Sequence, residues 1–133
     1  MKELTDELIE AHVQHGPQVP TVNSTMHIYP INGACHQVAP GATAFAYRDA
    51  NFATVIAGMW PEPADNEANT RWVRDYYDAT APNSEEGGYI NFMGADDQER
   101  IKANYKGNYD RLVEAKRTYD PENLFHLNQN IKP

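Results

Sequence analysis

The fold is decided by the stretch STMHIYPINGACHQVAPGATAFAYRDANFATVIAGMW, Ser24 to Trp60. It contains four short runs with β character, separated by Gly33, by Pro40-Gly41 and by Asp49, which are residues typical of turns. The runs predict strands over residues 24–30, 33–40, 43–49 and 52–60. Because they are so close in sequence, the strands are expected to pair antiparallel.

Segments with helical periodicity flank this stretch. Residues 2–15 carry apolar side chains near helical spacing, namely Leu4, Leu8, Ile9 and Val13. Further helices are expected at about 65–79, from Asp96 or Asp97 to about Tyr105, and from about 107 to Tyr119, where the Asp120-Pro121 pair ends the last one. The run GGYINFM, residues 87–93, predicts another short strand.

These elements predict an α+β fold: an antiparallel sheet with helices packed on one face, followed by C-terminal helices and an extended C-terminal tail. A length of 133 residues predicts a single domain, residues 1–133. The net charge of −8 argues against nucleic acid or an anionic membrane as a partner. No apolar run approaches about 20 residues, so no membrane-spanning helix is expected. The acidic start, MKELTDELIE, does not resemble a signal peptide. Its composition therefore favours a soluble protein in the cytoplasm.

Polar side chains gather on one face of the first predicted strand. Its period of two places Met26 and Ile28 on one face, with Thr25, His27 and Tyr29 on the other. A half-solvated sheet explains such a face without any further purpose. The functional alternative is a face that covers a cavity in which a tyrosine or histidine handles protons.

The predicted strand at 87–93 repeats this pattern. It places Ile90 and Phe92 on one face, with Tyr89 and Asn91 on the other. The preceding Gly87-Gly88 pair lacks the spacing of either glycine-rich phosphate-binding motif, so no nucleotide phosphate site is expected there.

Histidine and cysteine positions do not predict a metal site. His12 and His15 are three residues apart on the first helix, a spacing able to hold a metal, but no third ligand lies nearby in sequence. Surface histidines are therefore expected. The single cysteine, Cys35, excludes an internal disulfide.

The C-terminal tail combines apolar residues with amides. Leu124, Phe125 and Leu127 directly precede the triplet Asn128-Gln129-Asn130. One interpretation is that the apolar residues fasten the tail to the core while the amides coat the surface. Because amides are costly to bury unpaired, the alternative is a partner with many donors and acceptors, such as a flavin ring edge or the backbone of another segment.

The last forty-odd residues resemble the C-terminal region of the berberine-bridge-enzyme-like FAD-linked oxidases. The family signature is Y-x-N, then N-Y-x-R-L-x-x-x-K-x-x-Y-D-P-x-N-L-F, then N-Q-N-I. The matching positions are Tyr89, Asn91, Asn108, Tyr109, Arg111, Leu112, Lys116, Tyr119, Asp120, Pro121, Asn123, Leu124, Phe125, Asn128, Gln129, Asn130 and Ile131. Residues from about 89 to 133 form this berberine-like segment, and the resemblance extends back to about Ser24.

Two positions depart from the family pattern. The chain has Asn32-Gly33-Ala34 where the family often has Gly-Gly-Ala. It also has Phe45-Ala46-Tyr47-Arg48 where the family often has F-x-H-R. The first departure concerns a turn. The second removes a histidine, so any role of that histidine does not carry over.

The resemblance implies a site shared with an FAD-binding domain. FAD, held mainly by a domain absent from this chain, would accept a hydride from a small-molecule substrate beneath a sheet of the substrate domain. Tyr89 is then the expected catalytic residue, as proton acceptor or substrate contact. Asn91, Asn128 and Gln129 are expected to contact the cofactor. His27 and Tyr29 are expected to face the substrate.

The expected function is the substrate-binding and C-terminal part of an FAD-dependent oxidoreductase. It would need an FAD-binding domain or subunit as partner and would be inactive alone. One alternative is a non-catalytic, self-associating module that reuses the fold, with a C2 homodimer as its commonest form. Another is a cofactor-free enzyme that uses His27, Tyr29 and Tyr89 for proton transfer.

Overall fold

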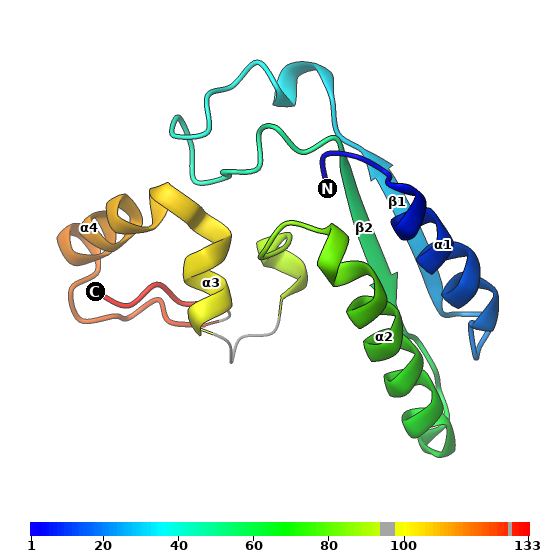
Figure 1. Cartoon of the computed structure of the whole chain (residues 1–133). Helices are drawn as coiled ribbons and strands as arrows, with labels where there is room; N and C mark the ends of the chain where they lie inside the picture. Colours follow the sequence, from blue (N-terminus) through cyan, green and yellow to red (C-terminus); the bar gives the residue numbers. More distant parts are fainter. Residues whose placement is uncertain (94–97, 128) are drawn as a thin grey trace. The chain divides into compact units, whose positions relative to one another are not determined.

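The computed structural model describes residues 1–93, 98–127 and 129–133 (Figure 1). Its helices and strands are α1 (Asp6–His15), β1 (Thr25–Pro30), β2 (Phe52–Ala57), α2 (Asn66–Thr80), α3 (Gln98–Tyr105) and α4 (Tyr109–Tyr119). Short 3-10 turns lie at Gly16–Gln18, Gly33–Cys35, Pro63–Asp65, Ala81–Asn83, Ile90–Phe92 and Lys106–Asn108. The chain forms two compact units: unit 1 holds residues 1–32 and 49–84, and unit 2 holds residues 33–48 and 85–133.

A two-stranded antiparallel sheet lies in unit 1. The register pairs Thr25 with Ala57 at one end and Pro30 with Phe52 at the other. The strands predicted at 24–30 and 52–60 are therefore confirmed. A sheet of two strands is only marginally stable by itself, so this sheet depends on what packs against it.

Three of the predicted strands are wrong. Residues 33–48 form turns, in which the His36 amide donates to the Gly33 carbonyl at 3.1 Å and the Ala42 amide donates to the Ala39 carbonyl at 3.0 Å. Residues 87–93 also turn, since the Phe92 amide donates to the Tyr89 carbonyl at 2.8 Å. These local bonds use the backbone groups that a sheet ladder would need.

The core of unit 1 forms where α1 packs against α2, and α2 also contacts β2 (Figure 1). Leu8 and Tyr76 are fully buried, and Trp72 donates from its indole nitrogen to the His15 carbonyl at 2.9 Å. Thr5 caps α1 by accepting a hydrogen bond from the Leu8 amide at 3.3 Å. The first two predicted helices are confirmed within a residue or a few at each end.

A polar contact joins the two-stranded sheet to α2. The buried Ser24 hydroxyl donates to Asn69 Oδ1 at 3.1 Å and accepts from the Met59 amide at 2.9 Å. Asn69 is fully buried on α2. These hydrogen bonds connect three parts of unit 1: the residue before β1, the residues just after β2, and helix α2.

Unit 2 contains α3, α4 and the loop 33–48. Ile101 on α3 is fully buried. Asn108 donates to the Pro40 carbonyl at 2.8 Å and Arg111 donates to the Gly41 carbonyl at 2.7 Å, so the loop is fastened to the start of α4. Both helices agree with the prediction, although the proposed caps Asp96 and Asp97 lie outside the described residues. Over residues 1–93, 98–127 and 129–133, no helix is long and apolar enough to cross a membrane.

Candidate functional site

Tyr89 and Asn91 interact directly in unit 2. The Asn91 side-chain nitrogen donates to the Tyr89 hydroxyl oxygen at 3.0 Å. The rings of Tyr89 and Phe92 also form a T-shaped pair, with centroids 5.3 Å apart. The two polar residues lie together as predicted, but a 3-10 turn brings them together rather than a strand. Phe92, predicted on the face opposite these two residues, is 70% exposed.

The Gly87-Gly88 turn sets the start of this segment. Gly87 has φ +90°, a backbone conformation that residues other than glycine rarely adopt. A Cβ at this position would overlap the Tyr47 hydroxyl. The Gly88 amide donates to Asn104 Oδ1 at 3.0 Å. Protein groups therefore lie directly beside Gly87 and bond the Gly88 amide.

His27 and Tyr29 lie on one exposed face of β1 in unit 1. Their rings stack with centroids 5.7 Å apart, and Thr25 Oγ1 lies 3.2 Å from His27 Nε2. Thr25, His27 and Tyr29 therefore share one face of β1, as predicted, although burial does not alternate along the strand. Their role toward a substrate stays a prediction.

The C-terminal tail does not bury its apolar residues. Leu124, Phe125 and Leu127 are 73%, 77% and 82% exposed, so the expectation that they fasten the tail to this chain's own core is wrong. Of the amides, Asn128 lies outside the described residues. Gln129 donates from its side-chain nitrogen to the Met93 carbonyl, which links the tail to the end of the segment that carries Tyr89 and Asn91.

A charged hub shapes the turn from which the apolar residues emerge. Asp120 pairs with Lys116 and accepts from the backbone amides of Leu124 and Phe125 at 2.7 Å and 3.0 Å. Lys116 also donates to the Phe125 carbonyl at 2.5 Å. The hydrogen bond from Lys116 holds the pKa of Asp120 below its usual value. The turn is therefore fixed within the chain while its apolar side chains remain exposed.

His12 is a buried residue, contrary to the expectation of surface histidines. It is 8% exposed, and its Nδ1 lies 2.8 Å from the Tyr76 hydroxyl. Its place on the buried face of α1, one turn after Leu8, was the signal for this burial. Where the structure describes the chain, no cluster of three or more His, Cys, Asp or Glu residues could hold a metal ion.

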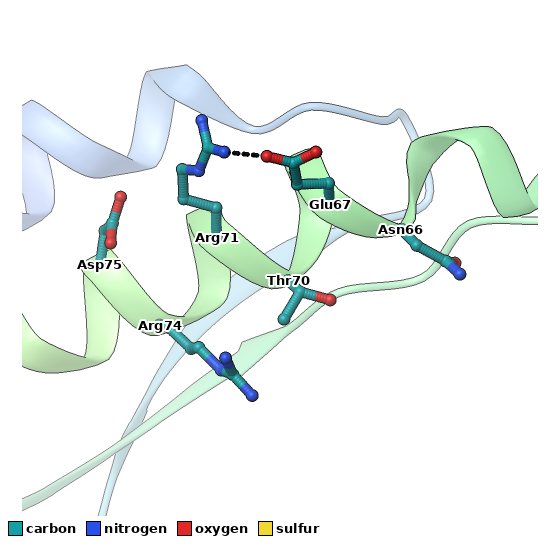
Figure 2. Close-up of a pocket in the computed structure, with 6 residues that line it drawn as sticks. All are labelled: Asn66, Glu67, Thr70, Arg71, Arg74 and Asp75. Carbon is teal, nitrogen blue, oxygen red and sulfur yellow. Dashed lines mark hydrogen bonds and ion pairs between the residues drawn. The ribbon is translucent and has the colours of Figure 1, made fainter.

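A shallow depression on α2 holds none of the predicted site residues (Figure 2). It is lined by Asn66, Glu67, Thr70, Arg71, Arg74 and Asp75. Arg71 turns toward Glu67 and pairs with it, while Arg74 points to another side of the helix (Figure 2). Because one helix supplies the whole lining, the depression does not enclose a ligand.

Comparisons with known proteins identify the family. Residues 88–132 match the family described as berberine and berberine like. Over 132 residues the chain is 31% identical to the uncharacterized FAD-linked oxidoreductase YgaK of Bacillus subtilis, covering 99% of this chain and 29% of that protein. It is 30% identical over 124 residues to the aclacinomycin-N/aclacinomycin-A oxidase of Streptomyces galilaeus, covering 80% of this chain and 23% of the oxidase.

A solved structure of an oxidase has a similar fold. The crystal structure of a glycopeptide hexose oxidase complexed with teicoplanin superposes with a TM-score of 0.79 at 28% identity, covering 98% of this chain and 30% of that one. The α+β fold class is thereby confirmed. The chain spans less than a third of the length of these three proteins. It belongs to the berberine-bridge-enzyme-like FAD-linked oxidoreductases, and its residues 88–132 match their berberine-like segment.

Proposed function

We propose that this chain is the substrate-binding and C-terminal part of an FAD-dependent oxidoreductase, in which it covers the flavin and supplies active-site groups. One observation carries the proposal. Tyr89 and Asn91 form an exposed phenol–amide pair within the segment that matches the family, and Tyr89 is 51% exposed. Two hydrogen-bonding groups held together at a surface are suited to meet a polar ligand.

The described residues fit contact with a flavin ring but not the binding of a whole dinucleotide. The side-chain amides of Asn91 and Gln129 are suited to the donor and acceptor atoms of a ring edge. The Gly88 amide is already bonded to Asn104 Oδ1, and the Gly87-Gly88 pair lacks the spacing of a phosphate-binding motif. FAD would therefore be held mainly by an FAD-binding domain or subunit. When bound, it supplies the acceptor for the hydride that leaves the substrate.

The proposed roles follow from the side-chain chemistry. Tyr89 would accept a proton from the substrate as a phenolate, or would contact the substrate directly as a phenol. Asn91 donates to its oxygen, a hydrogen bond that suits either form. Gln129 already donates to the Met93 carbonyl, so its cofactor contact would use the amide oxygen. Asn128 remains a proposed cofactor contact, and His27 and Tyr29 remain proposed substrate contacts.

The proposed partner is the FAD-binding part of the enzyme. Leu124, Phe125 and Leu127 are exposed in this chain, and a cluster of exposed apolar side chains marks an interaction surface. The relatives are more than three times as long as the part that this chain covers, which leaves room for such a part. We propose that the tail residues are buried against it.

The test measures flavin reduction in the assembled enzyme. Substrates would be found by anaerobic bleaching of the flavin absorbance with a panel of hexoses and glycopeptides, since a hexose oxidase and a glycopeptide hexose oxidase are among the similar proteins. Tyr89→Phe should then lower the rate constant of flavin reduction by about 100-fold or more, the usual effect of losing a proton-transfer group. Tyr119→Phe, at an 86% exposed tyrosine, is the matched control. A Tyr89→Phe enzyme that reduces its flavin at the unaltered rate removes Tyr89 from the mechanism.

A second candidate is a non-catalytic module that associates with itself. The exposed apolar tail residues favour it as well, because a second copy could cover them. The two candidates differ in measurable ways. A self-associating module gives a concentration-dependent dimer mass and no flavin absorbance after co-expression with an FAD-binding domain. The proposed function predicts flavin in the joint complex.

A further inference from the structure

The segment Gly87–Met93, here called the Tyr89 segment, is held at its first end by a buried side chain. Asn104 on α3 is 6% exposed, and its Oδ1 accepts the hydrogen bond from the Gly88 amide at 3.0 Å. The contact is close, since a Cβ added at Gly87 would lie 3.1 Å from the Asn104 Cα. The path of the backbone into Tyr89 is therefore fixed by an amide that points away from solvent.

Tyr47 holds the residue just before the segment. It is 8% exposed and its hydroxyl donates to the Glu86 carbonyl. Burial, with the nearby Glu85 and Glu86 charges, raises the pKa of Tyr47 to about 12, so the hydroxyl keeps its proton at physiological pH. Lys106 lies over the Tyr47 ring, 4.0 Å from its centroid, and pairs with Glu85 at 2.5 Å. Ring and hydroxyl are thus both held in place.

The second end of the segment is also tied. The Gln129 side chain donates to the Met93 carbonyl, so a residue of the C-terminal tail holds the last residue of the segment. Between these two ends stand the exposed side chains of Tyr89 and Asn91 and the bond that joins them. The segment exposes its polar pair while its backbone ends are bound to other parts of unit 2.

We propose that Asn104 and Tyr47 are positioning residues, which act through the Gly87-Gly88 turn to hold the Tyr89–Asn91 pair in its hydrogen-bonded geometry. The importance of this pair to catalysis rests on the proposed function, whereas the positioning itself does not. Neither residue follows from the family signature. Tyr47 stands where the family often has a histidine, and Asn104 lies outside the signature positions.

The test uses the complete chain labelled with nitrogen-15. Asn104→Leu removes the acceptor of the Gly88 amide, and Tyr47→Phe keeps the ring but removes the hydroxyl. In both variants the Gly88 amide should exchange its hydrogen about tenfold faster, the effect expected for one lost hydrogen bond. The side-chain amide signals of Asn91 should also move toward those of a solvated asparagine. Asn104→Asp retains an acceptor oxygen and should restore both signals, and Tyr119→Phe is the matched control.

Two results overturn the proposal. One is unchanged Gly88 exchange in both variants, and the other is faster exchange with unchanged Asn91 side-chain signals. If Asn104→Leu fails to fold, Tyr47→Phe decides alone. In the assembled enzyme, Asn104→Leu should slow flavin reduction without loss of flavin, and Asn104→Asp should restore the rate. Should Tyr89→Phe leave the rate unaltered, the proposed function fails, while the amide measurements still decide the positioning role.

Discussion

The contact between His12 and Tyr76 gives the sharpest stability prediction. Tyr76 is fully buried on α2, and its hydroxyl lies 2.8 Å from Nδ1 of the buried His12 on α1. His12 Nε2 is buried without a hydrogen-bond partner. The contact of Nδ1 with Tyr76 therefore replaces a hydrogen bond to water that the ring loses on burial. Tyr76→Phe deletes that contact and keeps the ring in place against Trp72, 5.7 Å away between centroids.

The expected loss is about 2 kcal/mol in the free energy of unfolding of unit 1. A typical hydrogen bond contributes about 1 kcal/mol, and a buried group left without a partner costs about 1–3 kcal/mol. Both tryptophans of the chain, Trp60 and Trp72, lie in unit 1. Urea denaturation followed by tryptophan fluorescence therefore reports on this unit. A loss below about 0.5 kcal/mol, equal to that of the control Tyr119→Phe, would refute the reasoning.

The same contact predicts a direction for the pH dependence. Burial lowers the pKa of His12, so between the folded and unfolded values the unfolded chain binds more protons than the folded one. The free energy of unfolding should therefore fall as the pH drops below about 6.5, the ordinary histidine value. His12→Gln should reduce this dependence. Stability that rises on acidification through this range contradicts the assignment.

Three further predictions concern other contacts. Ser24→Ala should lower the free energy of unfolding by about 2 kcal/mol, because the hydroxyl bonds a buried amide on α2, and urea denaturation measures this. The carboxyl of Asp120 should titrate below its ordinary value in an NMR titration, so its stabilising effect is lost only as the pH falls through that lowered value, and Lys116→Met should raise the midpoint. Leu124→Ser combined with Phe125→Ser should change the free energy of unfolding by less than about 0.5 kcal/mol but reduce the binding of a hydrophobic dye, since both residues are exposed. A large loss of stability in this double variant would show that the tail is packed.

Helices were predictable from the sequence because their signal is local. In α1 the apolar spacing and the cap at Thr5 lie within a few residues of one another. The strands were less predictable. Residues 33–48 contain β-type residues such as Val38 and Phe45, but Pro40 and Gly41 favour turns, and the pairing of a strand depends on a partner that the local pattern does not name.

The candidate site was predictable in part. The family motif identified Tyr89 and Asn91 as neighbours, and the structure joins them by a hydrogen bond. The buried position of Asn104 had no signal in the sequence, because an asparagine on a helix is usually exposed and its partner is a distant backbone amide. The two interpretations of the tail could not be separated from the sequence for a related reason, since apolar residues indicate burial but do not say which surface buries them.

The charged hub at Asp120 has a consequence for association. Its bonds to the amides of Leu124 and Phe125 set the backbone of the turn before any partner arrives. Association with this turn would therefore lose less conformational entropy than the ordering of a flexible tail. The association rate should then rise in proportion to partner concentration, without a plateau set by a slow rearrangement of the turn.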